Sequence, residues 1–257
     1  MSFLDDVLVV KQGEVDALRL NPPARSRAPR ASGFAEALRG SGLSVIAEIK
    51  RRSPSKGDMA PGLDAAATVR AYARGGAAAV SCLTDRGFFG ARDADFEAAG
   101  ASSLPRLRKD FIIDELQIDE SAAMGAAAIL LIVRILDDAR LTALHAHASE
   151  LGLDVLVEVH DEAEIDRALA SGAALIGVNN RDLATLHVDP HRAERLRPRI
   201  PAGVVSVAES GVRRREDVQR IEAAGFDAVL IGETLATSPD PAATLRALLG
   251  SSEAVAS

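Results

Sequence analysis

Polar residues that could take part in acid–base chemistry follow short apolar runs at six points of this 257-residue chain. The runs are VIAEIK (45–50), LPRLRKD (104–110), VLVEVH (155–160), LIGVNNR (175–181), VVSVAES (204–210) and VLIGE (229–233). An apolar stretch that ends in charged or amide residues is typical of a buried strand whose far end opens into a polar pocket. Six such ends predict strands whose tips converge on carboxylates, ammonium groups, an amide and glycines suited to a phosphate.

The alternation of side chains along a strand assigns a direction to the first of these groups. Glu48 and Lys50 share a face with Ile46, so both are expected to point into the pocket at the strand ends. A buried carboxylate is costly unless it is paired, and Lys50 is the obvious counter-charge. The two residues therefore form either part of a reactive site or a structural ion pair that closes the end of the sheet.

A lysine and a glutamate stand out on two further strands. Lys109 lies on the face of Leu107, and Phe111 follows on the same side, although Lys109 could also be a surface residue at a strand end. Glu158 stands inside the apolar run LVEV, on the face of Leu156. An unpaired carboxylate there would be destabilising or would take up a proton with a raised pKa. Groups perturbed in this way are frequent acid–base catalysts, which makes Glu158 a catalytic candidate.

The run at 175–181 ends in an amide and a guanidinium group. Asn179 and Arg181 share a strand face, and an arginine can hold a carboxylate through two parallel hydrogen bonds. Asp182 follows directly and could instead hold Arg181 in a local structural pair. The sequence leaves both interpretations open.

Glycines follow the runs at 204–210 and 229–233. In barrel proteins, glycines after the last two strands and a short helix N-terminus form the usual phosphate site, made largely of backbone N–H groups. Glu209 and Ser210 close the first of these runs and Gly211 follows them, whereas Gly232 and Glu233 close the second. Ser53, in the first loop, could supply a hydroxyl group to the same phosphate. Alternatively, each glycine only ends its strand and Ser53 is an ordinary turn residue.

The composition argues against several classes of protein. The net charge is 30 − 37 = −7, with no long basic tract, so nucleic acid is not an expected partner. Cys82 is the single cysteine and is expected in the core, and ligand pairs such as CxxC or HExxH are absent, so no metal site is expected. His160 and His187 are expected to be capping or loop residues.

The chain carries no sign of a membrane or secretory protein. No apolar run reaches the roughly 18 residues that a membrane span needs. Acidic residues precede the short apolar run of MSFLDDVLVV, which is the wrong charge order for a secretory signal. We therefore expect a cytoplasmic protein without a membrane partner.

A repeated joint of small residues indicates the architecture. Gly76, Gly125, Gly172 and Gly225 lie 49, 47 and 53 residues apart, and each precedes an apolar run. Each glycine suits the end of a helix, and the spacing fits two strand–helix units. With the runs near 44–50, 104–110, 154–160 and 204–210, this predicts eight alternating units and an α/β fold, the (β/α)8 TIM barrel. The alternative is an open doubly wound sheet, but no GxGxxG follows 44–50.

Residues 1–40 stand outside these eight units. Six apolar residues in this segment have the spacing of one helix face: Phe3, Leu4, Val7, Leu8, Val15 and Leu18. The segment NPPARSRAPRASG is a plausible linker to a second short helix, FAEALR. We predict a single barrel domain over 1–257, of which residues 1–40 form an N-terminal helical extension that lies against the barrel.

In eight segments that follow one another along the chain, the sequence closely resembles the indole-3-glycerol phosphate synthase family. The matching segments are IAEIKRRSPSKG (46–57), SCLTDRGFFG (81–90), LRKDFIIDELQI (107–118), ILLIV (129–133), LVEVHDEAE (156–164), GVNNRDLATLHVD (177–189), AESGV (208–212) and LIGETL (230–235). The resemblance implies a TIM barrel with an N-terminal helical extension. It also implies conversion of 1-(2-carboxyphenylamino)-1-deoxyribulose 5-phosphate to indole-3-glycerol phosphate, carbon dioxide and water, in tryptophan biosynthesis.

The resemblance further implies a role for each site residue, with no metal or organic cofactor. Lys109 would be the general acid of ring closure and Glu158 the acid–base group of dehydration, with Glu48 and Lys50 as the polar floor. The anthranilate side would be shaped by Asn179, Arg181, Glu209 and Ser210, the phosphate would be held by Ser53, Gly211, Gly232 and Glu233, and the aromatic pocket would be lined by Phe111 and Leu131.

Two rival functions fit parts of the same pattern. Another sugar-phosphate barrel enzyme, such as phosphoribosylanthranilate isomerase, would share the phosphate loops but would not need Lys109 together with Glu158. A non-catalytic phosphate-ligand binder would be expected to have lost one of these charged groups. The expected partner is a phosphorylated small molecule, and the protein is expected to be a monomer or a weak homodimer.

Overall fold

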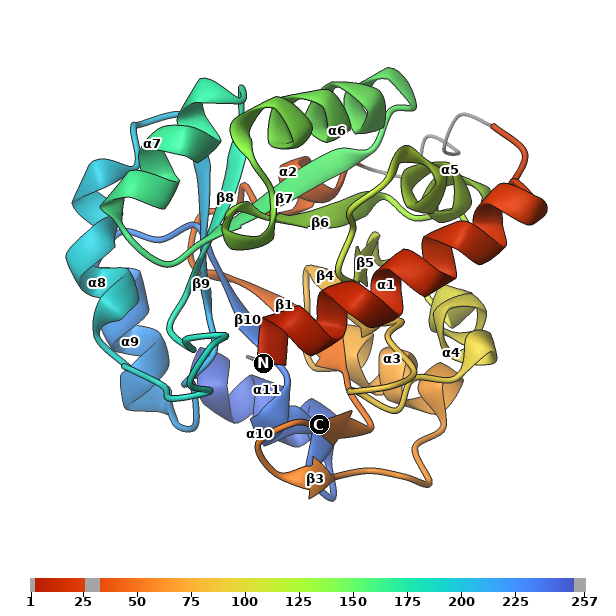
Figure 1. Ribbon diagram of the computed structural model, residues 1–257. Coiled ribbons are helices and arrows are strands. Elements are labelled where there is room, and N and C mark those ends of the chain that lie inside the picture. The colour runs from red at the N-terminus through yellow and green to blue at the C-terminus, as the bar shows by residue number, and fades with distance from the viewer. Residues whose placement is uncertain (1–2, 26–32, 252–257) are drawn as a thin grey trace.

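Eight parallel strands close into a barrel in the computed structural model, which describes residues 3–25 and 33–251. In chain order they are β1 (Ser44–Ile49), β4 (Ala79–Leu83), β5 (Arg106–Lys109), β6 (Ala128–Ile132), β7 (Asp154–Val159), β8 (Leu175–Asn179), β9 (Val205–Glu209) and β10 (Ala228–Ile231). Strand β10 pairs with β1, which completes the ring and rules out the open doubly wound sheet. The predicted TIM barrel is confirmed (Figure 1).

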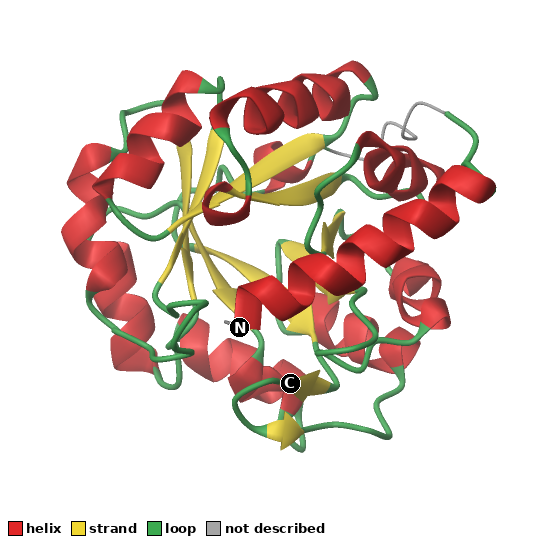
Figure 2. Ribbon diagram, viewed as in Figure 1, coloured by secondary structure: helices red, strands yellow, loops and turns green. Residues whose placement is uncertain are grey.

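Helices alternate with the strands and surround the barrel (Figure 2). They are α3 (Ala65–Arg74), α4 (Asp93–Ala98), α5 (Glu115–Ala123), α6 (Asp138–Glu150), α7 (Glu162–Ala170), α8 (Arg192–Leu196), α9 (Arg215–Ala223) and α11 (Pro241–Leu249), with the short α10 (Glu233–Ala236) after β10. The carboxylates of Asp64, Asp114, Asp137 and Asp161 each accept a backbone N–H at the start of a helix. Aspartate is favoured there because it satisfies a free donor of the first turn.

The four repeated glycines each have a positive φ, between 77° and 91°. Each lies immediately after a helix, at Gly76, Gly125, Gly172 and Gly225, where the chain turns into the next strand. Residues with a Cβ rarely adopt this left-handed conformation, so the glycines end the helices as expected.

The side chains of the strands form two separate apolar layers. On β6, the buried Ala128, Leu130 and Ile132 belong to the cluster inside the barrel, whereas Ile129 and Leu131 belong to the layer between the strands and the helices. The prediction that Leu131 lines the aromatic pocket is therefore wrong. Successive residues of a strand point to opposite faces, so it is Leu130 and Ile132 that reach the pocket.

The N-terminal segment contributes two helices that contact the barrel interior from outside the eight units. Helix α1 (Phe3–Leu20) lies across one face of the barrel, in front of the strands in Figure 1. Its buried Leu4 and Val7 join the inner apolar cluster, and so do Phe34 and Leu38 in and beside α2 (Phe34–Ala37). The predicted helical extension and the short second helix are confirmed. Most of the predicted linker between them lies outside the described residues.

A lysine on the buried face of α1 was not foreseen. The side chain of Lys11 is 1% exposed, and its ammonium nitrogen lies 2.8 Å from carboxylate oxygens of both Asp85 and Asp110. Asp110 directly follows the candidate acid Lys109, and its pKa is lowered to about 2, because the nearby Arg108 and Lys11 outweigh the effect of burial. Hydropathy alone does not reveal a buried lysine, because its two partners come from distant parts of the sequence.

Candidate active site

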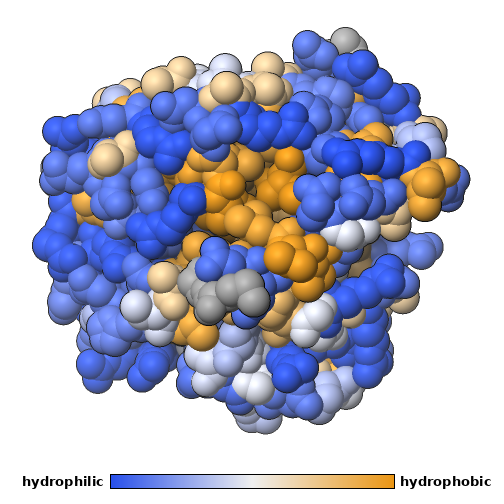
Figure 3. Space-filling model, in the orientation of Figure 1, coloured by the Kyte–Doolittle hydropathy of each residue, from blue (hydrophilic) through white to orange (hydrophobic). Residues whose placement is uncertain are grey.

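All but one of the residues predicted for the site line adjoining pockets at the carboxyl-terminal ends of the strands, which we call the mouth. Those that line it are Glu48, Lys50, Ser53, Lys109, Phe111, Glu158, Asn179, Arg181, Glu209, Ser210, Gly211, Gly232 and Glu233. Leu131 is the exception. Figure 3 shows apolar residues gathered at the centre of this face, framed by hydrophilic side chains.

Lys109 lies at the centre of a group of buried carboxylates. Its Nζ is 3.5 Å from Glu158 Oε2 and 3.5 Å from Glu209 Oε2. Burial alone would lower the pKa of Lys109, but the carboxylates of Glu158, Glu209 and Glu48 raise it well above the ordinary value. Lys109 is thus a protonated ammonium group that faces the mouth, and not a surface lysine.

Glu48 and Lys50 form the ion pair that their shared strand face predicted. Lys50 Nζ lies 2.5 Å from Glu48 Oε1, and Ser81 Oγ lies 3.4 Å from Glu48 Oε2. Burial raises the pKa of Glu48, but Lys50 and Lys109 outweigh it and lower the pKa overall. Glu48 is therefore an ionised carboxylate, and with Lys50 it lines the same pockets as Lys109.

Glu209 is the carboxylate whose proton affinity is raised. Burial, together with the negative charges of Glu158 and Glu48, raises its pKa to about 8, although Lys109 opposes the shift. Gly177 on β8 leaves space for the Glu209 carboxyl group, since a Cβ at position 177 would lie only 2.1 Å from Glu209 Oε1. A protonated Glu209 reduces the negative charge that an anionic ligand would meet in the mouth.

Replacing Glu209 with glutamine should make the folding stability less dependent on pH. Because the pKa of Glu209 is raised in the folded state, its contribution to stability is complete below the unfolded pKa and is lost as the pH rises towards about 8. Urea unfolding at about pH 6 and about pH 9 should show a smaller loss of stability in Glu209→Gln than in the unchanged protein. Equal losses in both proteins would contradict the protonated state of Glu209.

Aromatic rings form one wall of the mouth. The rings of Phe89 and Phe111 lie 6.2 Å apart between centroids, and Phe3 of α1 contacts Phe111 edge-on at 6.3 Å. Phe111, Leu130 and Ile132 line the same pocket as Lys109. Such a surface suits a flat aromatic ligand. Phe3 and Phe89 were not among the predicted site residues.

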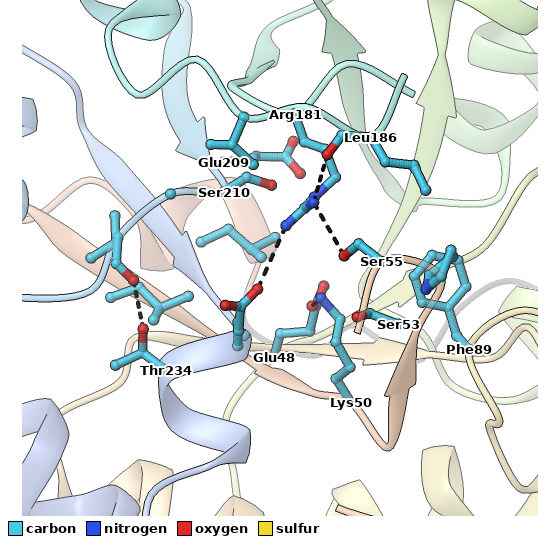
Figure 4. Close-up of a pocket in the computed structure, with 18 of the residues that line it drawn as sticks. Glu48, Lys50, Ser53, Ser55, Phe89, Arg181, Leu186, Glu209, Ser210 and Thr234 are labelled. Carbon is cyan, nitrogen blue, oxygen red and sulfur yellow. Dashed lines mark hydrogen bonds and ion pairs between the residues drawn. The ribbon is translucent and has the colours of Figure 1, made fainter. Parts of the chain in front are cut away.

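Arg181 crosses the pocket and is held at several points (Figure 4). Its Nη1 donates to the Leu186 carbonyl at 2.9 Å and to Ser55 Oγ at 3.3 Å, and its Nη2 lies 3.6 Å from Glu233 Oε2. Asn179 Oδ1 accepts the backbone N–H of Arg181 at 2.9 Å, which fixes the end of β8. Arg181 therefore faces the mouth and does not form the alternative local pair with its neighbour in the sequence.

That neighbour, Asp182, pairs with Arg134 instead. Arg134 Nη1 lies 3.1 Å from Asp182 Oδ2, and its Nε donates to Glu164 Oε1 at 2.8 Å. Arg134 lines neither pocket of the mouth. Outside the mouth, Arg134 thus binds a carboxylate of α7 and a carboxylate of the loop after β8.

The corner beside β9 and β10 has an unusual backbone. Ser210 and Gly211 both have positive φ, 65° and 89°, which is rare for a serine. Gly232 lies beside Glu48, and a Cβ at this position would come within 2.4 Å of the Glu48 carboxylate. Both glycines line the pocket, and neither backbone N–H has a hydrogen-bond partner in the described part of the chain. Free donors of this kind can bind an anion.

Two cations reach the same corner. Lys56 forms a close ion pair with Glu233, which also lies near Arg181. Lys56 belongs to a small hairpin of β2 (Arg52–Ser53) and β3 (Gly57–Asp58) that the sequence analysis did not predict. Its segment includes Ser53, which lines the pocket as expected.

His160 lies in the loop between β7 and α7, as expected, but its side chain is buried among carboxylates. Its Nε2 is 3.4 Å from Glu158 Oε1 and its Nδ1 is 3.0 Å from Glu164 Oε2. The sequence contained a signal for the contact between His160 and Glu158, because residues two positions apart lie on the same side of an extended strand.

Neither a metal site nor a membrane helix was found among the residues that the structure describes. Within residues 3–25 and 33–251, no group of three or more His, Cys, Asp or Glu side chains is arranged to hold a metal ion. Across these same ranges, no helix is both long and apolar enough to cross a lipid bilayer.

Comparison of the sequence with known proteins gives a consistent result. The family model of indole-3-glycerol phosphate synthase matches residues 4–248. An indole-3-glycerol phosphate synthase of Chlorobium phaeovibrioides is 50% identical over 249 residues, which cover 93% of this chain and 96% of that protein. Indole-3-glycerol phosphate synthase 2 of Streptomyces coelicolor is 52% identical over 224 residues, or 87% of each chain.

More distant solved structures share the fold alone. A mutant tryptophan synthase α-subunit of Pyrococcus furiosus aligns with a TM-score of 0.61 at 17% identity, over 81% of this chain and 98% of that one. Thiamine phosphate pyrophosphorylase of the same organism aligns with a TM-score of 0.60 at 14% identity, over 83% and 96%. The family match spans the barrel and all thirteen predicted site residues that line the mouth, and the chain therefore belongs to the indole-3-glycerol phosphate synthase family.

Proposed function

We propose that this chain converts 1-(2-carboxyphenylamino)-1-deoxyribulose 5-phosphate to indole-3-glycerol phosphate, carbon dioxide and water, as a carboxy-lyase. The observation that carries the proposal is the position of Lys109, whose ammonium group meets the carboxylates of Glu158 and Glu209 beside an aromatic wall. This arrangement offers a proton donor and a proton acceptor to one flat, anionic substrate.

Ring closure is assigned to Lys109. As the aromatic ring carbon attacks the ketone carbon of the substrate, negative charge develops on the ketone oxygen, and the Lys109 ammonium donates a proton to it. The neighbouring Glu48, Glu158 and Glu209 keep Lys109 protonated beforehand, because they raise its pKa. The ion pair of Glu48 and Lys50 forms the polar floor, and Lys50 lies near the anionic groups of the substrate.

The later steps are assigned to the opposite side of the mouth. Loss of carbon dioxide requires the carboxylate to lie out of the ring plane, and Asn179, Arg181 and Ser210 shape the space around it. In the dehydration that follows, Glu158 takes a proton from the substrate and the hydroxyl group leaves as water, with a proton from an ammonium group of the mouth. The aromatic ring rests against Phe111.

Inorganic phosphate or sulfate is expected to bind where β9 and β10 end. The free backbone donors of Gly211 and Gly232, the hydroxyl of Ser53 and the cations Lys56 and Arg181 favour an anion there. A crystal structure obtained with either anion should show density at this corner. Density elsewhere in the mouth, with this corner empty, would contradict the phosphate site.

Growth complementation separates the proposed function from its rivals. The gene for this chain should restore tryptophan-independent growth to a bacterial strain that lacks indole-3-glycerol phosphate synthase. It should not rescue a strain that lacks phosphoribosylanthranilate isomerase. Rescue of the second strain alone would favour the isomerase, and rescue of neither by a well-expressed, folded protein would favour a non-catalytic binder.

The same proposal includes the state of the protein in the cell. We predict a single barrel domain that acts in the cytoplasm as a monomer or a weak homodimer. We also predict that it needs no metal or organic cofactor. Sedimentation analysis of the purified protein tests its oligomeric state.

A further inference from the structure

A chain of buried charged groups leads away from Glu158 on the side opposite to the substrate. Glu158 Oε2 faces Lys109, whereas its other oxygen, Oε1, faces His160 Nε2 at 3.4 Å. His160 Nδ1 lies 3.0 Å from Glu164 Oε2, and Glu164 Oε1 accepts a hydrogen bond from Arg134. His160 does not line the mouth, so any effect that it has on the substrate must pass through Glu158.

The contacts of Glu164 determine where His160 holds its first proton. Glu164 Oε2 accepts the backbone N–H of His160 at 2.7 Å, and Arg134 binds the other oxygen at 2.8 Å. Burial raises the pKa of Glu164, but the hydrogen bonds from His160 and Arg134 outweigh it and lower the pKa overall. Glu164 is thus an ionised acceptor, and the Nδ1 that faces it must be a donor.

This assignment leaves a mismatch at the other ring nitrogen. If Nδ1 carries the only proton of a neutral imidazole, then the lone pair of His160 Nε2 faces the carboxylate oxygen of Glu158. Both atoms are buried, and neither has a hydrogen-bond partner among the described residues. One additional proton between Nε2 and Oε1 would satisfy both atoms, whether it resides on the histidine or on the glutamate.

We propose that His160 is the proton partner of Glu158: it shares one proton with Glu158 Oε1 and accepts that proton when Glu158 takes another from the substrate. The inference rests on the proposed role of Glu158. In the dehydration step the substrate C–H bond breaks and its proton binds Glu158 Oε2. At the same time the proton shared at Oε1 moves fully to His160 Nε2, so Glu158 carries one proton before and after. The proton on Oε2 then passes to the neighbouring Lys109 and replaces the one given to the leaving hydroxyl group, and His160 returns its proton to Oε1 before the next turnover.

The surroundings of the pair favour this transfer. An imidazolium at His160 is stabilised by the ionised Glu164, which Arg134 holds in place. The charged groups that face the pair come from several elements, and they are Lys109 (β5), Glu209 (β9), Glu48 (β1), Glu164 (α7) and, through Glu164, Arg134 after β6. All of these charged groups influence how the rate of the reaction depends on pH. Substitution of His160 therefore isolates the contribution of His160 to the pH profile.

Two substitutions of His160 separate proton transfer from simple positioning. His160→Gln places an amide N–H where Nε2 lies, so it can hold Glu158 but cannot accept a proton. His160→Asn keeps a group near Nδ1, facing Glu164, but loses the contact with Glu158. We expect both variants to lower kcat by about 10- to 100-fold, the range found for outer partners of metal-binding side chains, with KM within about twofold because His160 does not touch the substrate.

The matched control is His147→Gln. His147 also contacts a carboxylate, Asp119, at 2.9 Å, but it lies on α6 and does not line the mouth. Its kcat and pH profile should stay unchanged, whereas the pH profile of kcat in His160→Gln should lose a titration step. Unchanged kcat and an unchanged pH profile in His160→Gln would overturn the proposal.

A double variant distinguishes failure of this inference from failure of the proposed function. If His160 acts through Glu158, then adding His160→Gln to Glu158→Gln should lower kcat no further. Additive losses would overturn the coupling. If Glu158→Gln itself keeps full turnover, the proposed role of Glu158 is wrong; if only Glu158→Gln is impaired, the His160 inference alone is wrong.

Discussion

Replacing Lys109 with alanine is expected to lower kcat by about 10²–10⁴-fold, the usual contribution of a positioned general acid. The ammonium group of Lys109 is the proton donor that lies between Glu158 and Glu209. Substrate binding should change far less than kcat, because the phosphate corner and the aromatic wall lie elsewhere in the mouth. Steady-state kinetics and a circular-dichroism melt would measure turnover and the persistence of the fold.

Lys109→Arg is the matched control for charge. It keeps a cation opposite the two carboxylates, but a guanidinium gives up its proton much less readily than an ammonium group. Low turnover in both variants would show that proton donation, and not charge alone, is required. Near wild-type turnover in Lys109→Ala would mean that the acid has been assigned to the wrong residue.

Replacing Glu158 with glutamine should impair dehydration more than the earlier steps. The amide preserves the shape of the side chain but cannot accept a proton, so an intermediate should accumulate after ring closure and loss of carbon dioxide. The chain contains no Trp, one Tyr and seven Phe, so the fluorescence of the indole product is read against a weak background. Quenched reactions analysed by mass spectrometry would identify the intermediate.

Glu162→Gln serves as the control for this prediction, since it makes the same chemical change on the exposed first turn of α7. Glu162→Gln should form indole-3-glycerol phosphate at the unchanged rate. If Glu158→Gln does the same, with full yield, Glu158 is a structural partner of Lys109 and not the acid–base group.

Sequence periodicity was sufficient to predict the barrel and most of the mouth. Strand alternation placed Glu48 with Lys50 and Lys109 with Phe111 on inward faces, because the face that a strand residue occupies depends only on local spacing. Leu131 was implied by the family resemblance, whereas strand alternation on β6 gives the inner face to Leu130 and Ile132. The four aspartate caps were equally local, since each binds a backbone N–H within its own helix turn.

Interactions between distant segments could not be predicted in this way. Lys11 is buried because it forms ion pairs with Asp85 and Asp110, which lie in two other loops. The residue spacing within α1 does not predict these two partners. The ring contacts that Phe3 and Phe89 make with Phe111 likewise depend on how α1 and the loop after β4 pack over the mouth. The raised pKa of Glu209 requires three carboxylates from three strands in one buried space.

The measurement that tests the central claim most directly is turnover of 1-(2-carboxyphenylamino)-1-deoxyribulose 5-phosphate by the purified protein, followed by indole fluorescence and by release of carbon dioxide. The account predicts one carbon dioxide for each indole-3-glycerol phosphate formed, at a rate that Lys109→Ala reduces by orders of magnitude. Absence of indole product from a folded protein that binds the substrate, or an equal rate in Lys109→Ala, would contradict it.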